Sequence, residues 1–313
     1  ATCFPTAATV ANSWDTELAE AVGEALGNEA RSQGVDVLLG PGLNIKRSPL
    51  CGRNLEYFSE DPYLSGKLAA AYVRGIQRGG ALACVKHYAV NSQEFRRMTL
   101  NAVVDERALR ELYLTGFEIA VKEGKPAVLM TSYNQVNGLQ SNENPQLMLD
   151  ILRDEWGYDG MVVTDWGGSD DHIRGIQCRT TLEMPNPGLY AAREVLRAVE
   201  RGELSEAEID VCLRDYFRTL RRAAVQAKKA VPVDPLRQHA LARRAARESA
   251  VLLKNDGILP LSGEETVALI GDFAFMPRYQ GAGSSLVNSR RVETLAGQLS
   301  QRLGGKLIGA ASG

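Results

Sequence analysis

The chain has 313 residues, of which 44% are hydrophobic and 24% charged, values that are ordinary for a globular protein. Its formal net charge of −2 gives no electrostatic reason to expect binding to nucleic acid or to an anionic membrane surface. No run of about 18 apolar residues occurs, so the sequence predicts no membrane-spanning helix.

The cysteines and the first residues bear on the compartment. Five cysteines without paired spacing argue against a disulfide framework and against a zinc site. The first five residues lack the charged and apolar regions of a signal peptide. These two features favour a cytoplasmic location. We expect neither a metal nor a cofactor.

The first half of the chain predicts strands alternating with helices. Apolar runs that end in turn residues predict buried strands at 35–39, 81–85, 126–130 and 160–163. Helical periodicity predicts helices at 13–34 (with Ser13 as N-cap), 65–77, 105–123, 145–155 and 170–177. Long irregular loops at 43–62 and 91–101 carry many polar residues, which is typical of functional loops.

Polar side chains follow each predicted strand. Arg53 comes after the first strand, Lys86 and His87 after the second, Tyr133 after the third and Asp165 after the fourth. A closed parallel barrel gathers such residues at one rim, whereas an open doubly wound sheet concentrates them near a switch point. The pattern therefore favours a (β/α)8-type, TIM-like barrel.

Asp165 stands at the end of the short apolar stretch 160–163 and is followed by Trp166 and two glycines. A carboxylate in this place is either a reactive group at the mouth of the barrel or the N-cap of the following helix. The stretch alone does not separate these two interpretations.

The second half of the chain predicts a change of domain. A strand end at 182–185 precedes helices at 190–201 and from 204 onward, the latter with Ser205 as N-cap. Proline-rich residues 231–235 predict a linker, and a short strand is expected at 250–254. We therefore expect a barrel domain at 1–222, a linker at 223–245 and the start of an α/β sandwich domain at 246–313.

The residue types at the strand ends suit an uncharged polyol better than a phosphate. Lys86, His87 and Arg53 donate hydrogen bonds, and Trp166 offers an apolar face to a sugar ring. The P-loop and dinucleotide fingerprints are absent, and the glycine-rich stretch 281–285 lacks the lysine that a P-loop requires.

Glycoside cleavage needs two carboxyl groups, one to attack and one to protonate the leaving oxygen. Asp165 is the candidate nucleophile, which the neighbouring cations Lys86 and Arg53 are expected to keep ionised. A second catalytic carboxylate is harder to identify. For each loop carboxylate, an ion pair with a nearby arginine is the simpler interpretation; these residues are Glu56, Glu60, Glu94 and Asp170.

Several motifs, in order along the chain, resemble glycoside hydrolase family 3. They are GPGLNI at 40–45, CGRNLEYFSEDP at 51–62, VKHY at 85–88, MTSYN at 130–134, TDWG at 164–167 and LEMP at 182–185. LLKNDG at 252–257 and RYQGAGSS at 278–285 resemble the start of that family's second domain. The resemblance covers nearly the whole chain.

The resemblance implies a retaining exo-β-glycosidase most similar to the β-glucosidases, with a barrel followed by an α/β sandwich. It implies that Asp165 is the nucleophile and that Arg53, Lys86 and His87 bind sugar hydroxyls. Further residues are implied to line or adjoin the site for the terminal sugar; they are Met130, Tyr133, Trp166 and Glu94.

Three departures from the family pattern accompany this resemblance. The strand with an Asp-Gly-Pro-like motif is expected before Ala1, and the acid/base glutamate of such β-glucosidases is expected beyond Gly313, so the chain looks truncated at both ends. Cys178-Arg179-Thr180-Thr181 stands where the family usually reads Ala-Gly-Leu-Asp, which puts the local backbone at Arg179 in question.

Other activities stay open at this point. The N-acetylglucosaminidase branch is disfavoured because residues 89–93 replace its Pro-Gly-His-Gly loop. A β-xylosidase or another exo-β-glycosidase is the nearest alternative to a β-glucosidase acting on β-glucosides or cello-oligosaccharides. A sugar-binding chain without turnover is the alternative from a different class. A homo-oligomer is possible in any of these cases.

Overall fold

The computed structural model describes residues 1–227 and 232–311 and forms two compact units. The larger unit spans Ala7–Asp234, and the smaller one combines Ala1–Thr6 with Pro235–Gly313. None of the helices within those described ranges is both long enough and apolar enough to cross a membrane.

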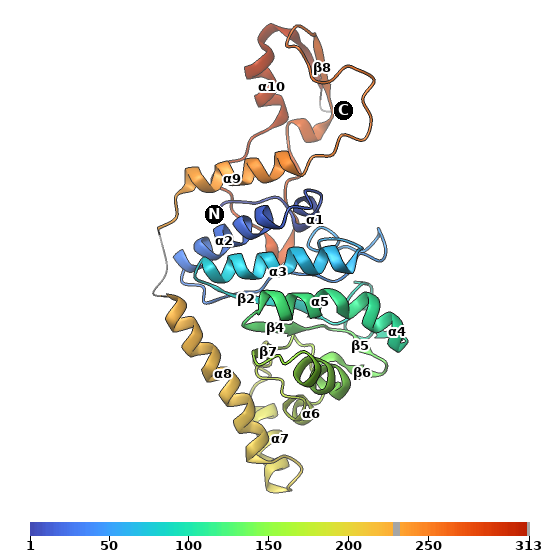
Figure 1. The fold of residues 1–313 in the computed structure, drawn as a ribbon, viewed down its shortest axis with the longest axis vertical. Helices are drawn as coiled ribbons and strands as arrows, with labels where there is room; N and C mark the ends of the chain where they lie inside the picture. Colours follow the sequence, from blue (N-terminus) through green and yellow to red (C-terminus); the bar gives the residue numbers. More distant parts are fainter. Residues whose placement is uncertain (228–231, 312–313) are drawn as a thin grey trace. The chain divides into compact units, whose positions relative to one another are not determined.

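The larger unit is built on a parallel sheet (Figure 1). Its four strands lie in the order β1 (Val37–Leu38), β2 (Leu82–Tyr88), β4 (Val128–Thr131) and β7 (Met161–Val163). A parallel bridge from Val163 to Leu182 continues the sheet beyond β7. A separate small sheet contains β3 (Asn101–Ala102), β5 (Gln135–Val136) and β6 (Leu139–Gln140).

Helices alternate with these strands, as the sequence predicts. Before β4 they are α1 (Ala7–Ala11), α2 (Thr16–Ser32), α3 (Pro62–Arg78) and one continuous helical stretch composed of α4 (Glu106–Ala108), η1 (Leu109–Leu114), α5 (Thr115–Ile119) and η2 (Ala120–Gly124). After β6 they are η3 (Ser141–Glu143), η4 (Gln146–Glu155), α6 (His172–Gln177), α7 (Leu189–Glu200) and α8 (Glu206–Ala227).

Helices α2 and α3 pack closely because glycines line their contact. A methyl group on Gly75 would lie 2.1 Å from the carbonyl oxygen of Glu20, and one on Gly23 would lie 2.6 Å from that of Tyr72.

The predicted N-cap of α2 is wrong: Asp15, not Ser13, accepts hydrogen bonds from the first free backbone amides. The carboxylate of Asp15 is also the stronger acceptor for those amides.

The hydrophobic core lies beneath the strand ends that carry the polar residues. Inward-facing side chains of β2, β4 and β7, among them Cys84, Met130 and Val163, form one buried cluster. Ala223 of α8 belongs to the same cluster.

The predicted strand 35–39 is only partly right, because β1 is two residues long and half-buried rather than buried. Its place at the end of the strand order explains the lower burial.

The smaller unit contains α9 (Pro235–Glu248), β8 (Val267–Ile270), α10 (Leu295–Leu303), β9 (Leu307–Ala311) and the short turns η5 (Asp272–Ala274), η6 (Gly283–Ser285) and η7 (Gly304–Lys306). Strands β8 and β9 pair in parallel with α10 between them, the α/β organisation expected here. The strand predicted at 250–254 is wrong: these residues have no regular structure, and Leu253 is 91% exposed.

The division between the units differs from the predicted linker at 223–245. Helix α8 continues to Ala227 and α9 begins at Pro235, so most of that range is helical. Residues 228–231 of the linker lie outside the described residues, as do 312–313 at the end of the predicted second domain. Proline at the first position of a helix is favourable, which is why Pro235 begins α9 instead of preventing it.

A buried ion cluster ties α8 to the residues around β7. Asp215 of α8 has a side chain that is 1% exposed, and it accepts hydrogen bonds of 2.7 and 2.9 Å from Arg179. The guanidinium groups of Arg153 and Arg218 lie 3.7 and 3.6 Å from the same carboxylate. Arg153 also donates to the carbonyl oxygens of Tyr158 and Gly160, just before β7.

Arg179 occupies a left-handed backbone conformation, with φ of 61°. Glycine adopts this conformation without steric cost, whereas a residue with a Cβ pays on the order of 1 kcal/mol. The pair with Asp215 offsets that cost in this chain. The sequence departs from the family pattern at Arg179, where the family usually has glycine. The backbone there keeps the left-handed conformation that suits glycine, and the ion pair between Arg179 and Asp215 stabilises it.

We expect Arg179→Gly to destabilise the fold less than Arg179→Ala, by about 1 kcal/mol. Both variants lose the ion pair, but only alanine keeps a Cβ in the left-handed conformation. Urea unfolding of the two variants measures this difference directly. An alanine variant as stable as the glycine variant would contradict the argument.

Candidate active site

Asp165 lies two residues after the end of β7 and is buried, with an exposed fraction of 7%. Its Oδ1 accepts a hydrogen bond of 2.8 Å from the backbone amide of Trp166. The next helix, α6, begins at His172 and is capped by Asp171, whose side chain accepts from the amide of Arg174. Asp165 is therefore not a helix cap, which removes the competing interpretation of this carboxylate.

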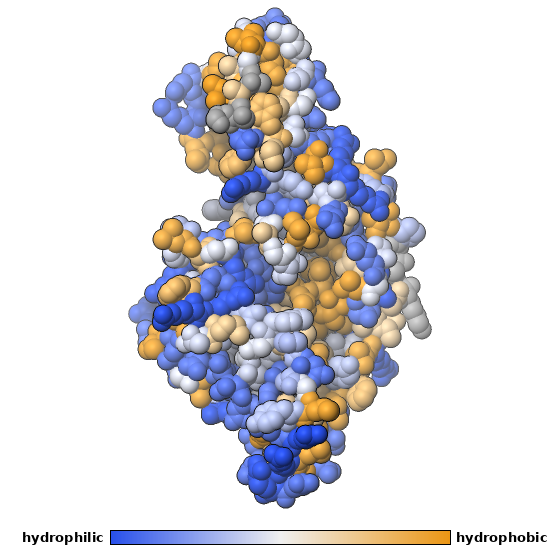
Figure 2. All heavy atoms as spheres, turned by 180° about the vertical axis from the view of Figure 1, so that it is seen from behind, coloured by the Kyte–Doolittle hydropathy of each residue, from blue (hydrophilic) through white to orange (hydrophobic). Residues whose placement is uncertain are grey.

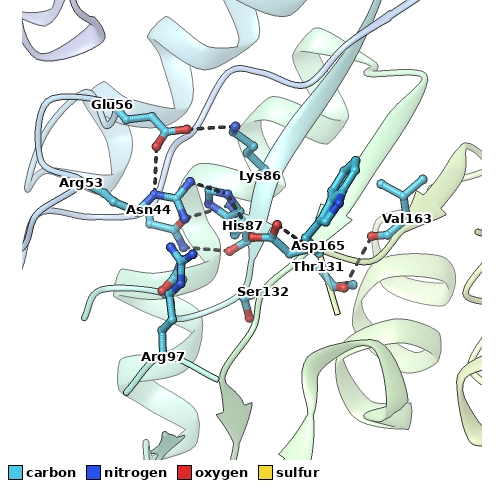
Figure 3. Close-up of polar contacts among 12 residues, drawn as sticks. Asn44, Arg53, Glu56, Lys86, His87, Arg97, Thr131, Ser132, Val163 and Asp165 are labelled. Carbon is cyan, nitrogen blue, oxygen red and sulfur yellow. Dashed lines mark hydrogen bonds and ion pairs between the residues drawn. The ribbon is translucent and has the colours of Figure 1, made fainter. Parts of the chain in front are cut away.

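The second oxygen of Asp165 faces a histidine. Oδ2 lies 3.4 Å from Nε2 of His87, the residue in β2 that the sequence places at the same rim (Figure 3). Arg53 Nη2 lies 2.8 Å from that same Nε2. A guanidinium group has only donors, so Nε2 must accept this bond and the ring proton must sit on Nδ1. Nδ1 then donates to the hydroxyl of Tyr57, 3.2 Å away.

The charge state of His87 follows from its surroundings. Burial, together with the positive charges of Arg53, Lys86 and Arg97, lowers the pKa of His87 well below its ordinary value. The ring is therefore neutral, and its Nε2, which accepts from Arg53, has no proton to offer to Asp165. Two acceptors cannot bond to each other, and Asp165 Oδ2 accordingly has no hydrogen-bond partner within the described part of the chain. This oxygen is the free, buried end of the carboxylate.

Glu56 connects two of the predicted sugar-binding cations. Its two carboxylate oxygens lie 2.9 Å from Nε of Arg53 and 2.9 Å from Nζ of Lys86 (Figure 3). Burial alone would raise the pKa of Glu56, but the two cations outweigh it and hold that pKa below its ordinary value. Glu56 is thus ionised and forms ion pairs that position Arg53 and Lys86, so it is not a proton donor. This agrees with the ion pair expected for it.

The loop after β2 supplies a second carboxylate, Glu94, that contacts cations of the site. Arg97 Nη1 donates to Oε2 of Glu94 at 2.6 Å, and Oε1 of Glu94 lies 3.8 Å from Arg53. The Arg97 guanidinium stacks over the Tyr133 ring, 4.5 Å from its centre. Burial, the negative charge of Asp165 and a hydrogen bond to the Asp165 carboxylate raise the pKa of the Tyr133 hydroxyl, so this hydroxyl keeps its proton.

The remaining predicted site residues lie in different surroundings. Trp166, directly after Asp165, is 51% exposed and presents its indole to solvent. Met130 is 2% exposed and belongs to the core cluster under the strand ends, where it contributes packing but no polar group. The roles of these two residues therefore stay predictions.

The loop after Asp165 is held by a buried carboxylate from another element. Oε1 of Glu143 accepts from the backbone amides of Asp170 and Asp171, at 2.6 and 2.9 Å, and from the hydroxyl of Ser169. These bonds satisfy amides that no helix satisfies. They restrain the segment that connects Asp165 to α6.

No group of three or more metal-binding side chains occurs in the ranges that the structure describes, 1–227 and 232–311. All five cysteines carry free thiols. The site therefore offers a carboxylate, a neutral imidazole, several cationic donors and an aromatic face, all at the C-terminal ends of parallel strands. Such a combination at one edge of a parallel sheet is the place and the chemistry of a candidate active site.

The chain belongs to glycosyl hydrolase family 3, because residues 1–215 match the family model described as "Glycosyl hydrolase family 3 N terminal domain". It is 48% identical to thermostable beta-glucosidase B of Acetivibrio thermocellus, over 98% of this chain and 41% of that protein. It is 41% identical to an exo-alpha-(1->6)-L-arabinopyranosidase of Bifidobacterium longum, over 96% of this chain and 41% of that protein.

The structure resembles that of beta-glucosidase 3B from Thermotoga neapolitana in complex with glucose. The TM-score is 0.92 at 39% sequence identity, covering 98% of this chain and 44% of that one. The family and the α/β barrel fold are thereby confirmed. The chain spans about 41% of the curated relatives named above.

Three residues of the site were not singled out in advance. Asn44 exchanges two hydrogen bonds of 2.8 Å with the backbone of His87 and so fixes that backbone in place. The Tyr57 hydroxyl accepts a hydrogen bond from His87 Nδ1, and the Arg97 guanidinium lies over the Tyr133 ring. Asn44 and Tyr57 lie within the family-like motifs at 40–45 and 51–62, so the sequence contained an indication of their importance. Their roles depend on a neighbour 43 or 30 residues away.

Replacing Glu56 with glutamine is expected to destabilise the protein by about 1–3 kcal/mol at pH 6, because two charge-assisted contacts weaken. The pKa of Glu56 is lowered in the folded state, so its contribution is complete above the unfolded value of about 4.3 and is lost as the pH falls below it. Urea unfolding at pH 6 and pH 3.5 should show the gap between wild type and variant closing at low pH.

The matched control for Glu56 is Glu118→Gln, which removes an exposed pair with Lys122 whose side chains are 42% and 48% exposed. We expect that variant to change stability by less than about 0.5 kcal/mol at either pH. If the difference in unfolding free energy between wild type and Glu56→Gln does not depend on pH, Glu56 is not an ionised partner of Arg53 and Lys86.

Proposed function

We propose that this chain is the barrel portion of a retaining exo-β-glycosidase that removes terminal β-D-glucosyl residues. The observation that supports this most strongly is the asymmetry of Asp165: Oδ1 is anchored by the amide of Trp166, while Oδ2 is buried and free of hydrogen bonds in the described residues. An oxygen with unengaged lone pairs is available to attack an electrophilic carbon, which is what a nucleophilic carboxylate does.

In the proposed reaction, Oδ2 of Asp165 attacks the anomeric carbon and forms a glycosyl ester as the glycosidic bond breaks. The leaving oxygen takes a proton from a carboxylic acid, and a water molecule, deprotonated by the resulting carboxylate, then cleaves the ester. Two inversions restore the original configuration. Arg53 and Lys86 donate to hydroxyl groups of the sugar in this proposal, and His87, whose Nε2 accepts from Arg53 and whose Nδ1 donates to Tyr57, orients the Arg53 guanidinium.

The carboxylic acid of this proposal is none of the carboxylates clustered around Asp165. Glu56, which lies within the cluster, is held ionised by Lys86 and Arg53 and cannot protonate a leaving group near neutral pH. Glu94 is engaged by Arg97 and faces Arg53. Both carboxylates therefore serve to position cations in this proposal.

Labelling with 2-deoxy-2-fluoro-β-D-glucosyl fluoride tests the nucleophile. Fluoride leaves without protonation, so the label forms even where the acid/base is missing. We expect a mass increase of one fluoroglucosyl group on the peptide that contains Asp165. A label on another residue, or none, would reject the proposed role and leave sugar binding without turnover as the better interpretation.

The sugar preference needs a separate measurement. A relative from Bifidobacterium longum is named an exo-alpha-(1->6)-L-arabinopyranosidase, so pyranosides other than glucosides belong in the panel. We expect the intact protein to hydrolyse nitrophenyl β-D-glucoside with a higher kcat/KM than the β-D-xyloside or the α-L-arabinopyranoside. A reversed order would keep the mechanism and change the substrate.

A further inference from the structure

The His87 ring lies between a cation on one side and a phenol on the other. Arg53 Nη2 lies 2.8 Å from Nε2, and the Tyr57 hydroxyl lies 3.2 Å from Nδ1. The Tyr57 ring meets the imidazole edge-on, with 6.2 Å between the ring centres and 75° between the ring planes. Because the guanidinium group can only donate, the ring proton sits on Nδ1, and the Tyr57 hydroxyl is the acceptor that this proton meets.

The contacts continue from Tyr57 to Asn91, and all of them lie below the surface. Tyr57 is 0% exposed, and His87 and Asn91 are each 1% exposed. Hydrophilic and hydrophobic residues are interspersed over the face shown in Figure 2, and exposure on that surface does not by itself mark a functional residue. A buried polar group is more informative, because a donor or an acceptor left without a partner there costs free energy.

The Tyr57 hydroxyl has a proton of its own to place. The amide nitrogen of Asn91 lies 3.5 Å from that hydroxyl, and in this orientation Oδ1 of Asn91 has no partner among the residues that the structure describes. Turning the amide by 180° exchanges its oxygen and nitrogen, which are alike in shape. Oδ1 then accepts the proton of the Tyr57 hydroxyl, and both groups are satisfied together.

The donors in this row of contacts then all point the same way. Arg53 donates to Nε2, Nδ1 donates to Tyr57, and Tyr57 donates to Asn91. The other tautomer of His87 would carry its proton on Nε2, which lies 2.8 Å from Arg53 and 3.4 Å from Oδ2 of Asp165 (Figure 3). That proton would oppose the guanidinium and would bond the carboxylate oxygen that is otherwise free.

We propose that Tyr57, with Asn91 behind it, is a positioning residue that keeps the nucleophilic oxygen of Asp165 free. Tyr57 acts through His87: it accepts the proton on Nδ1 and so keeps Nε2 unprotonated. Nε2 then binds Arg53 and has nothing to donate to Oδ2. This inference rests on the proposed function, because it concerns the oxygen that attacks the sugar. Tyr57 itself is fully buried and does not touch the substrate.

The first measurement is the tautomer of His87, read by ¹⁵N NMR of the intact, histidine-labelled protein near neutral pH. Protonated and unprotonated ring nitrogens differ in chemical shift, and the signals of His87 are those absent from His87→Asn. We expect the proton on Nδ1 in wild type and its transfer to Nε2 in Tyr57→Phe, which keeps the ring and loses only the hydroxyl. Asn91→Leu should act in the same direction, whereas Asn91→Asp, which keeps an acceptor, should retain the wild-type tautomer.

The second measurement is the rate of labelling by 2-deoxy-2-fluoro-β-D-glucosyl fluoride, which reports attack by Asp165 without the acid/base. The rate should fall by about tenfold in Tyr57→Phe, because a hydrogen bond from Nε2 to the carboxylate must break before Oδ2 attacks. The matched control is Tyr158→Phe, which removes another buried hydroxyl, bonded to the carbonyl oxygen of Met161 at 3.1 Å. That variant should keep both the tautomer and the labelling rate.

Two results would overturn the role of Tyr57: a proton that stays on Nδ1 in Tyr57→Phe and Asn91→Leu, or a labelling rate that falls equally in Tyr158→Phe. The two variants remove different hydrogen bonds, so if one does not fold, the other decides. A label on a residue other than Asp165, with the tautomer changing as expected, would reject the proposed function alone. A label on Asp165 with an unchanged tautomer would reject the role of Tyr57 alone.

Discussion

Replacement of Asp165 with alanine is expected to lower kcat of the intact protein by roughly 10⁴-fold or more, because the covalent step loses its nucleophile. Sodium azide should restore part of the turnover by entering the space left by the carboxylate. Because azide attacks once, the product should be the α-glycosyl azide, with inverted configuration. Steady-state kinetics and identification of that product by NMR measure both expectations.

The control for Asp165 is Asp170→Asn, an exposed carboxylate on the same loop whose backbone amide, not its side chain, bonds Glu143. We expect that variant to retain activity within about twofold of wild type, because surface substitutions of this kind change little. An Asp165→Ala variant with activity within tenfold of wild type would reject Asp165 as nucleophile. Production of the β-glycosyl azide would contradict direct entry of azide at that position.

Asp215→Ala is expected to cost about 3–5 kcal/mol of unfolding free energy, the usual effect of removing one partner from a buried ion pair. Asp215 is 1% exposed and faces three guanidinium groups, of which Arg153 is itself buried. Burial and the charge of Arg179 already lower the pKa of Arg153. Without the carboxylate, like charges remain together in a site that water reaches poorly.

Asp159→Ala provides the comparison for Asp215, since Asp159 pairs with Arg218 at 3.6 Å but is 82% exposed. We expect that change to cost less than about 1 kcal/mol. Urea unfolding of both variants measures the difference. If Asp215→Ala costs no more than Asp159→Ala, the buried cluster does not stabilise the fold.

Much of the architecture was predictable because it depends on local pattern. Apolar runs and helical periodicity located β2, β4, β7 and the helices between them, and the order of strands and helices predicted a parallel sheet. Parallel strands carry their C-terminal ends to one edge. For that reason His87, Tyr133 and Asp165 could be expected to meet although they are far apart in sequence.

The errors occur where structure depends on a distant partner. Residues 250–254 have the composition of a strand, but a strand forms only where another strand supplies its hydrogen bonds. The N-cap of α2 depended on which of two nearby polar residues reaches the first amides, and Asp15 does so. Pro235 suggested a linker by composition but begins a helix.

The site illustrates the same division. Residue types and their positions at strand ends were enough to nominate Asp165, Arg53, Lys86 and His87, because a hydroxyl-rich ligand requires donors and a carboxylate. The sequence by itself could not show that Arg53 fixes the His87 tautomer or that Glu56 braces two cations. Only the tertiary structure decided that Asp165 keeps one oxygen free, because that depends on contacts between β2, β7 and the loop after β1, whose residues meet only when the chain folds.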